Sequence, residues 1–201
     1  MIPIQPEDGA VAYYVRNITS VFVTASEAQY RAGRAWYETA NRTAEMIADG
    51  DVRTGAGVLA ALSPQTSWWL NVELACDAFD AGTARRHTTD SCSKANRIMA
   101  GENPEDVLPM RRKTGHFYRC IADPSDADAV CIDRHAYDIC VGIPLGDWER
   151  GLSAYGRYAL VADAYRRAAR SLGELPSTVQ AVTWVAWRDS IAGVGTRGSR
   201  V

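Results

Sequence analysis

The chain has 201 residues, of which 47% are hydrophobic and 23% are charged, and its formal net charge is −2 at pH 7. This composition is typical of a soluble globular protein that is long enough to bury its own core, so we expect one domain over residues 1–195 and a flexible tail over residues 196–201. The near-neutral charge argues against a basic field over the whole molecule, while a local basic patch remains compatible with it.

Apolar residues recur at helical spacing through most of the chain, and Gly, Pro and capping residues separate the segments. No segment longer than a few residues alternates as a strand does. We therefore expect an all-α fold with short connections. The number of segments with helical spacing predicts nine or ten helices. In chain order, the predicted helices cover residues 7–23, 24–48, 52–62, 67–79, 91–99, 104–108, 113–122, 134–141, 152–172 and 179–191.

The five cysteines show no CxxC spacing, which argues against a zinc ribbon, an iron–sulfur cluster and a disulfide framework. The three histidines lie far apart in the sequence, and we expect no metal and no other cofactor. No N-terminal signal sequence is visible, and no apolar run approaches the ~18 residues that cross a bilayer. The expectation is a cytoplasmic protein without a membrane partner.

The most informative segment covers residues 111–142. It contains Lys113 at the start of an amphipathic helix and, after a short apolar run, Asp133-Arg134-His135 at the start of another helix. An aspartate in this position either caps the helix or presents a charge to a substrate cleft, and one residue can do both.

Three stretches of the chain resemble motifs of one family in the same order. They are VLAALSPQTSWWLNVELACDAF at 58–79, SKANRIMAG at 93–101, and LPMRRKTGHFYRCI followed by VCIDRHAYDICVG between 108 and 142. The family is the helix-hairpin-helix DNA glycosylase superfamily, with the endonuclease III-like fold, and the resemblance covers roughly residues 55–145. It implies DNA as the partner and an enzyme that cleaves or modifies a base flipped into a pocket, in DNA repair or DNA modification.

The resemblance also assigns roles to individual residues. Asp133 matches the catalytic aspartate of the family, His135 matches the histidine two residues on, and Lys113 matches the Schiff-base lysine of the bifunctional members. Gln65 falls where the family has a glutamine that probes the DNA near the lesion. For Gln65 the alternative is that it satisfies the helix end broken at Pro64, and for His135 it is packing within its helix.

Aromatic residues near these motifs are candidates for base stacking. Trp68 and Trp69 are adjacent, so on a helix they point about 100° apart and cannot both be core residues. At least one should be partly exposed and able to stack on a base, the alternative being an interface tryptophan. The resemblance places Tyr118 and His116 near the same cleft.

The predicted hairpin departs from the family. Met110 and Arg111 stand where the tight turn of the family has glycines, whose backbone N–H groups approach a DNA phosphate. Side-chain contacts from Arg111 and Arg112 would then replace this grip. Because the altered hairpin no longer aims Lys113 as in the family, we favour a surface lysine that contacts phosphate or solvent over a Schiff-base nucleophile.

Arginines occur on two of the later predicted helices. Trp184 and Arg188 are four residues apart and share a helix face, which is more typical of core packing than of a site. Arg166, Arg167 and Arg170 form a basic edge, for which a solvated face is the default interpretation.

Three functional hypotheses remain open. The first is a glycosylase in which Asp133 stabilises the charge that develops on the sugar. The size and arginine-rich composition also resemble small glycosylase-like proteins of actinobacterial phages, some relatives of which help to build hypermodified thymines, and a phage protein would lie in the host cytoplasm. The second hypothesis is therefore a transferase that places an amine or amino acid on an activated thymine, with Asp133 as general base. The third is a non-catalytic DNA-binding module.

Overall fold

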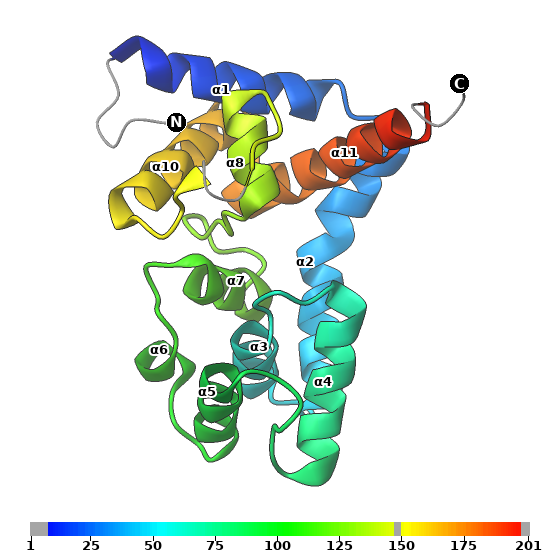
Figure 1. Ribbon diagram of the computed structural model, residues 1–201, viewed down its shortest axis with the longest axis vertical. Helices are drawn as coiled ribbons and strands as arrows, with labels where there is room; N and C mark the ends of the chain where they lie inside the picture. The colour runs from blue at the N-terminus through cyan, green and yellow to red at the C-terminus, as the bar shows by residue number, and fades with distance from the viewer. Residues whose placement is uncertain (1–7, 147–149, 198–201) are drawn as a thin grey trace. The chain divides into compact units, whose positions relative to one another are not determined.

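The computed structural model describes residues 8–146 and 150–197, and within these ranges the chain forms ten α-helices and no strand (Figure 1). The all-α prediction is confirmed. The helices are α1 (Asp8–Val23), α2 (Glu27–Ile47), α3 (Val52–Ala61), α4 (Trp68–Ala81), α5 (Thr89–Met99), α6 (Pro104–Val107), α7 (Lys113–Ala122), α8 (Arg134–Val141), α10 (Tyr155–Leu172) and α11 (Pro176–Arg197).

Most predicted helix ends agree with the structure because local capping signals set them. Helices α7 and α8 begin and end at the predicted residues, and Gly142 ends α8 in the left-handed conformation. The largest error concerns α11, which was expected at residues 179–191. It begins at Pro176, a residue suited to the first position of a helix, and continues to Arg197. Residues 198–201 of the predicted tail lie outside the described residues.

The chain divides into two compact units. The first unit comprises residues 1–36 and 130–201, and the second unit comprises residues 37–129. Helix α2 contributes its residues up to Trp36 to the first unit and the rest to the second. Whether the two units form the single domain expected from the length stays a prediction.

The first unit is a bundle in which α8 packs against α1, α10 and α11, and these helices also pack against one another. Its core is rich in aromatic and branched side chains, and Tyr137 and Tyr165 are completely buried in it. The carbonyl groups at the end of α8 accept hydrogen bonds from α1, from Asn17 Nδ2 to Cys140 O at 3.0 Å and from Tyr13 Oη to Val141 O at 3.3 Å. The short helix α8 is therefore held by its neighbours, since eight residues form a marginal helix on their own.

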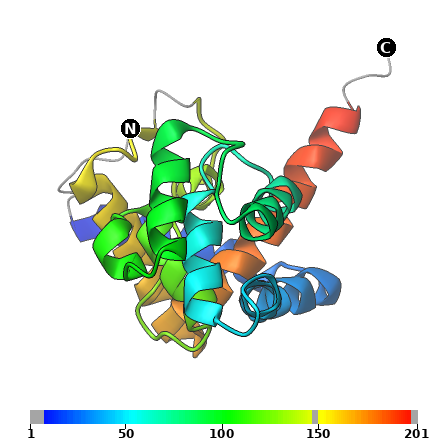
Figure 2. The ribbon, with the colours of Figure 1, turned by 90° about the horizontal axis from the view of Figure 1, so that it is seen from below.

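The second unit is built around α3, which packs against α4, α5, α6 and α7. Figures 1 and 2 show α3 between α4 and α5. Every residue from Gly55 to Ala61 is buried, and most of these residues are small and apolar. Small side chains allow the neighbouring helices to approach α3 closely, and at Gly55 an added Cβ would overlap with the backbone of Ala44.

The described part of the chain contains no helix that is both long and apolar enough to cross a bilayer. Four of the five cysteines are buried and all five are free, as expected for small core residues without disulfide bonds.

The hairpin between α6 and α7 forms without glycine in its turn. The N–H of Arg112 donates to the carbonyl of Pro109 at 2.9 Å, which closes a four-residue turn with Met110 and Arg111 at its centre. Neither central residue has a positive φ, since among the described non-glycine residues only Asp49 and Gln65 do. The turn therefore uses an ordinary backbone conformation in place of the glycine conformation that the family resemblance implies.

Gly115 allows α7 to approach this turn, and we expect Gly115→Ala to destabilise the protein by about 1–3 kcal/mol. An added Cβ would overlap with Cα of Met110, which is backbone and cannot move aside. In an unconstrained helix the same change stabilises by up to about 1 kcal/mol, so the sign of the effect is diagnostic. Urea unfolding of this variant and of Thr114→Ala, at the preceding position of α7, measures it. A more stable Gly115→Ala protein would contradict the close packing.

Candidate functional site

A buried extended segment delivers Asp133 to the start of α8. Val130, Cys131 and Ile132 are buried, and the hydroxyl of Tyr158 on α10 binds the segment at two points. It accepts the N–H of Ile132 at 3.1 Å and donates to the carbonyl of Val130 at 3.1 Å. The Tyr158 hydroxyl thus satisfies two backbone groups of the segment that have no helical partner. These hydrogen bonds fix the position of Asp133, which follows the segment.

Asp133 is half-buried and both of its carboxylate oxygens accept hydrogen bonds. Oδ1 accepts the backbone N–H of Ala136 at 2.8 Å, so Asp133 caps α8. Oδ2 accepts the indole Nε1–H of Trp184 on α11 at 3.1 Å. Because each carboxylate oxygen has two lone pairs, this arrangement fixes the carboxylate and still leaves acceptor capacity for a further group. The cap is observed, and the catalytic role of Asp133 stays a prediction.

Trp184 is the centre of a group of side chains from α2, α8 and α11. Its ring lies edge-on to that of His135 with 6.5 Å between centroids, and edge-on to that of Trp36, also at 6.5 Å. The guanidinium carbon of Arg188 lies 4.4 Å above the Trp184 ring, a cation–π contact. We call Asp133, His135, Trp36, Trp184 and Arg188 the Asp133 cluster; all five belong to the first unit.

His135 accepts a hydrogen bond through one ring nitrogen, and its other ring nitrogen is buried. Nε of Arg134 donates to its Nε2 at 3.3 Å, so the neutral ring carries its proton on Nδ1. Nδ1 is buried and has no hydrogen-bond partner among the described residues. Burial lowers the pKa of His135 below its ordinary value of 6.5; the Asp133 carboxylate opposes this shift, and Arg134 and Arg188 add to it.

This environment predicts that His135 makes stability depend on pH. Since the folded-state pKa lies below the unfolded value of 6.5, the unfolded state binds more protons between the two values. The contribution of a neutral His135 is complete above pH 6.5 and is lost as the pH falls through the folded pKa. We expect His135→Gln to become more stable relative to wild type as the pH is lowered below 6.5. Urea unfolding of both proteins at a series of pH values measures this, and parallel curves would contradict it.

Gln65 lies in the turn between α3 and α4 and has a φ of 60°, in the left-handed region. A non-glycine residue pays roughly 1 kcal/mol for this conformation, and such residues are enriched at functional sites. Gln65 is exposed. Its backbone is therefore unusual in a way that the sequence did not predict.

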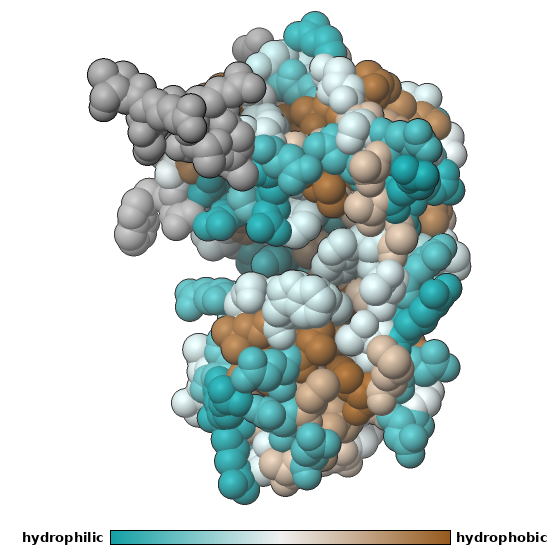
Figure 3. Space-filling model, turned by 90° about the vertical axis from the view of Figure 1, so that its right-hand side faces the viewer, coloured by the Kyte–Doolittle hydropathy of each residue, from teal (hydrophilic) through white to brown (hydrophobic). Residues whose placement is uncertain are grey.

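The two adjacent tryptophans differ strongly in exposure. Trp68 is half-buried and its ring lies edge-on to that of Phe117 on α7, with 6.5 Å between centroids. Trp69 is 83% exposed, which confirms that at least one of the pair is not a core residue. Figure 3 shows one face of the molecule, on which apolar and polar side chains are mixed. An exposed indole of this size is unusual for a monomeric surface and is available for stacking.

The basic residues of the hairpin lie at the start of α7. Arg111 and Lys113 are exposed, and Arg112 is half-buried at the N-cap position. Lys113 and Phe117 are one helical turn apart, so the Trp68–Phe117 contact joins the start of α4 to the face of α7 that carries Lys113. The exposure of Lys113 agrees with the surface lysine favoured above.

Tyr118 and His116 are core residues of the second unit. Tyr118 is only 3% exposed; its hydroxyl donates to Glu105 at 2.7 Å and accepts from Nε of Arg53 at 3.3 Å. Burial, together with the hydrogen bond to Glu105, raises the pKa of Tyr118 to about 12. His116 is buried as well. These positions favour a structural role for both over the substrate contact that the resemblance implies.

The predicted site residues thus divide between the two units. Asp133 and His135 belong to the first unit, and the structure brings them together with Trp184. The residues of the second unit are Gln65, Trp68, Trp69, Arg111, Arg112, Lys113 and Tyr118. Of these, Trp68 and the Lys113 face of α7 are joined through Phe117, whereas Tyr118 is directed toward Arg53 and Glu105.

Sequence reasoning missed the importance of Trp184, Arg188 and Tyr158. The shared face of Trp184 and Arg188 was noticed but interpreted as core packing. The available signal was that a tryptophan carries one N–H donor, which needs an acceptor when it is buried. Nothing local in the sequence identifies Asp133, 51 residues away, as that acceptor.

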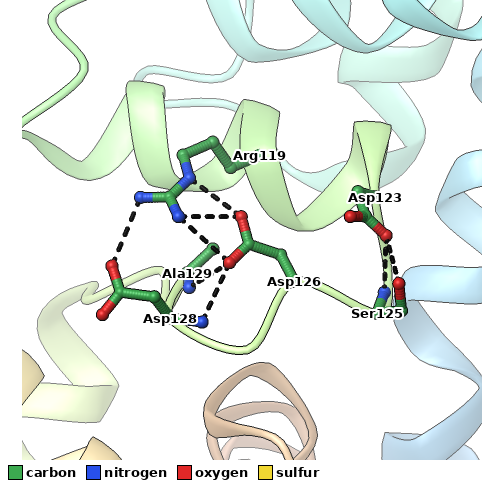
Figure 4. A network of polar contacts seen from close by, with 6 residues as sticks. All are labelled: Arg119, Asp123, Ser125, Asp126, Asp128 and Ala129. Carbon is green, nitrogen blue, oxygen red and sulfur yellow. Dashed lines mark hydrogen bonds and ion pairs between the residues drawn. The ribbon is translucent and has the colours of Figure 1, made fainter.

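The acidic residues that precede the buried segment stabilise a turn. Figure 4 shows Arg119 directed at Asp126, with nitrogen–oxygen distances of 2.8–3.0 Å, and at Asp128. Burial alone would raise the pKa of Asp126, but the N–H groups of Asp128 and Ala129 and the Arg119 guanidinium hold it below its ordinary value. Across residues 8–146 and 150–197, no group of three or more His, Cys, Asp or Glu side chains is arranged to hold a metal ion.

A family model matches most of the chain. The model, for a family of unknown function (DUF7178), matches residues 1–191. The chain belongs to this family. No curated protein and no solved structure matches the chain. Membership in the family brings no activity with it, so the function has to be inferred from the site.

Proposed function

We propose that the protein is a DNA-base-acting enzyme of the helix-hairpin-helix glycosylase type, which cleaves the N-glycosidic bond of a flipped nucleotide next to Asp133. The observation that carries this proposal is the carboxylate of Asp133, half-buried and held by Ala136 N–H and Trp184 Nε1–H at the end of a pinned segment. Asp133 also stands in the D-x-H motif, so the resemblance to the glycosylase family supports the same role as the geometry.

The chemistry requires a fixed negative charge. As the bond between C1′ and the base nitrogen breaks, the electron pair leaves with the base and positive charge develops on the sugar. A carboxylate that cannot rotate away stabilises this charge without reorganising during the reaction. Water then adds to C1′ and gives up one proton, which balances the proton taken up by the leaving base.

The two N–H donors favour this role over that of a general base. Proton abstraction from an amine, which the transferase hypothesis requires, uses a carboxylate oxygen as the proton acceptor, and each oxygen of Asp133 would have to take that proton through its remaining lone pair, beside an N–H hydrogen bond it already accepts. In the second unit, the exposed ring of Trp69 offers a stacking surface for a base. Arg111, Arg112 and Lys113 are the candidate phosphate contacts of the hairpin.

The test is incubation with oligonucleotides that each carry one damaged or 5-substituted base, followed by analysis of free bases and of strands cut by alkali. Release of a free base together with an alkali-labile site supports the glycosylase. A heavier nucleoside that appears only with an added amine and an activated thymine would replace it with the transferase. Salt-sensitive binding with neither product, unchanged in Asp133→Asn, would reduce the protein to a binding module.

A further inference from the structure

Arg188 lies beside the candidate catalytic residue, and its guanidinium has no carboxylate partner among the residues that the structure describes. It is exposed on α11 and stacks on the Trp184 ring at 4.4 Å. In the described part of the chain it makes no ion pair or side-chain hydrogen bond, in contrast with Arg150 and Arg97, which each bind a carboxylate through two nitrogens. The neighbouring Asp189 accepts a hydrogen bond from Gln29 instead, at 2.9 Å.

A second arginine lies on the other side of His135. Arg134 is exposed and its Nε donates to the His135 ring, while Arg188 is close enough to the same ring to influence its charge state. Two guanidinium groups therefore approach a neutral imidazole on which two carboxylates also act, those of Asp133 and Asp138. Asp138 is neutralised by its ion pair with Arg150, so the remaining local formal charge is positive by one, from Arg134, Arg188 and Asp133, in a chain whose overall charge is −2.

We infer that Arg188, assisted by Arg134, forms a phosphate-binding subsite for the nucleotide whose base is processed at Asp133. This inference rests on the proposed function. A guanidinium that stacks on an aromatic ring keeps its N–H edges free and oriented, and it can bind two oxygens of a phosphate at once. Trp184 connects Arg188 with Asp133, because the indole on which the Arg188 guanidinium stacks also donates a hydrogen bond to the Asp133 carboxylate.

Such a subsite offsets an electrostatic repulsion that the proposed reaction involves. A carboxylate beside the sugar repels the phosphates on either side of the flipped nucleotide, and a chain of net charge −2 provides no general attraction for DNA. An arginine held at a fixed position relative to the carboxylate offsets this repulsion. It also sets the distance between the bound phosphate and C1′, which positions the scissile bond.

Binding of oligonucleotides in which single phosphates are replaced by neutral methylphosphonates tests the subsite. The proteins are Asp133→Asn, to prevent turnover, and the same variant combined with Arg188→Gln, Arg134→Gln or Arg31→Gln. Arg31 is an exposed arginine of the first unit that pairs with Glu27 and serves as the matched control. We expect Arg188→Gln to weaken binding about tenfold, Arg134→Gln to weaken it less, and Arg31→Gln to leave it unchanged, as expected for the loss of one charge-assisted contact.

The decisive result is non-additivity. Neutralising one phosphate next to the target base should weaken DNA binding by the Asp133→Asn protein, which keeps Arg188, about tenfold. The same change should not weaken binding further when Arg188→Gln is also present, as expected when Arg188 contacts that phosphate. Equal losses in both proteins at every phosphate, or an Arg188→Gln protein that binds like Arg31→Gln, would overturn the subsite.

The outcomes distinguish a failure of the phosphate subsite from a failure of the proposed glycosylase function. Base release by wild type without Arg188–phosphate coupling removes the subsite alone. Coupling without base release by wild type supports the anion site and removes the glycosylase. Absence of DNA binding at low salt by proteins that unfold cooperatively removes both.

Discussion

Asp133→Asn is expected to slow base release at least about a hundredfold while the protein keeps its fold, the size of effect seen when one preorganised electrostatic group is lost. Asparagine is as good a helix cap as aspartate, and its carbonyl oxygen can still accept the N–H of Ala136. The negative charge is lost, and the group facing Trp184 Nε1 changes when the amide nitrogen takes the place of Oδ2. Single-turnover rates with the best substrate of the oligonucleotide panel measure the effect.

Asp51 provides a control for this experiment. It caps α3 through a hydrogen bond from the N–H of Thr54 at 3.0 Å, so it repeats the capping geometry of Asp133 without a tryptophan partner. Asp51→Asn should leave the rate of base release unchanged. Asp133→Ala removes the cap as well and should cost about 1 kcal/mol of stability in addition to the activity. A wild-type rate in Asp133→Asn would show that Asp133 is only a cap.

Arg150→Met is expected to destabilise the protein by about 3–5 kcal/mol, the largest effect on stability that we predict. Asp138 on α8 is 2% exposed, and Arg150 binds it through Nε at 2.8 Å and Nη2 at 2.7 Å. Arg150 Nη2 also donates to the carbonyl of Leu145. Methionine would leave the Asp138 carboxylate buried without a cation, and this desolvated charge is the source of the cost.

Urea unfolding of Arg150→Met, Asp138→Asn and the double variant measures this coupling. Arg97→Met is the matched control, because Arg97 binds Glu102 with the same two-nitrogen geometry while both side chains are 47% exposed. An exposed pair of this kind contributes only about 0.2–1 kcal/mol, so its loss should be small. Similar losses in Arg150→Met and Arg97→Met would contradict a role for burial. A double variant whose free energy of unfolding equals that of either single variant would support the pairing, because the second substitution then removes no further interaction.

The helices of this protein could be predicted because their ends are encoded locally. Ser67 and Asp133 cap α4 and α8 through bonds to residues three positions on, and Gly82 and Gly142 end the same helices in the left-handed conformation. Capping residues, glycines and a 3.6-residue period act within a few positions of the chain, so a single sequence reveals them. The end of α11 was missed because the helix continues through Gly193 and Gly195, although glycine near the end of an apolar pattern usually signals a helix end.

The candidate site was predictable only where a motif marks it. Asp133 and His135 stand in a D-x-H motif after an apolar run, and the tryptophan pair follows a helix break. Which tryptophan is exposed depends on the contact of Trp68 with Phe117, which lies on another helix. The partners of Asp133 and the free guanidinium of Arg188 depend in the same way on how α11 packs against α8.

The sequence alone therefore determined the helical class of the protein, most helix boundaries and the place of one capping aspartate, because these depend on neighbours along the chain. Only the tertiary structure decided that Tyr158 pins the segment before Asp133, that Trp184 holds its second oxygen, and that Arg150 neutralises Asp138. Each of these contacts joins side chains from different elements. A buried donor or charge must find its partner in space, and a linear pattern does not record which of many candidates packing will bring there.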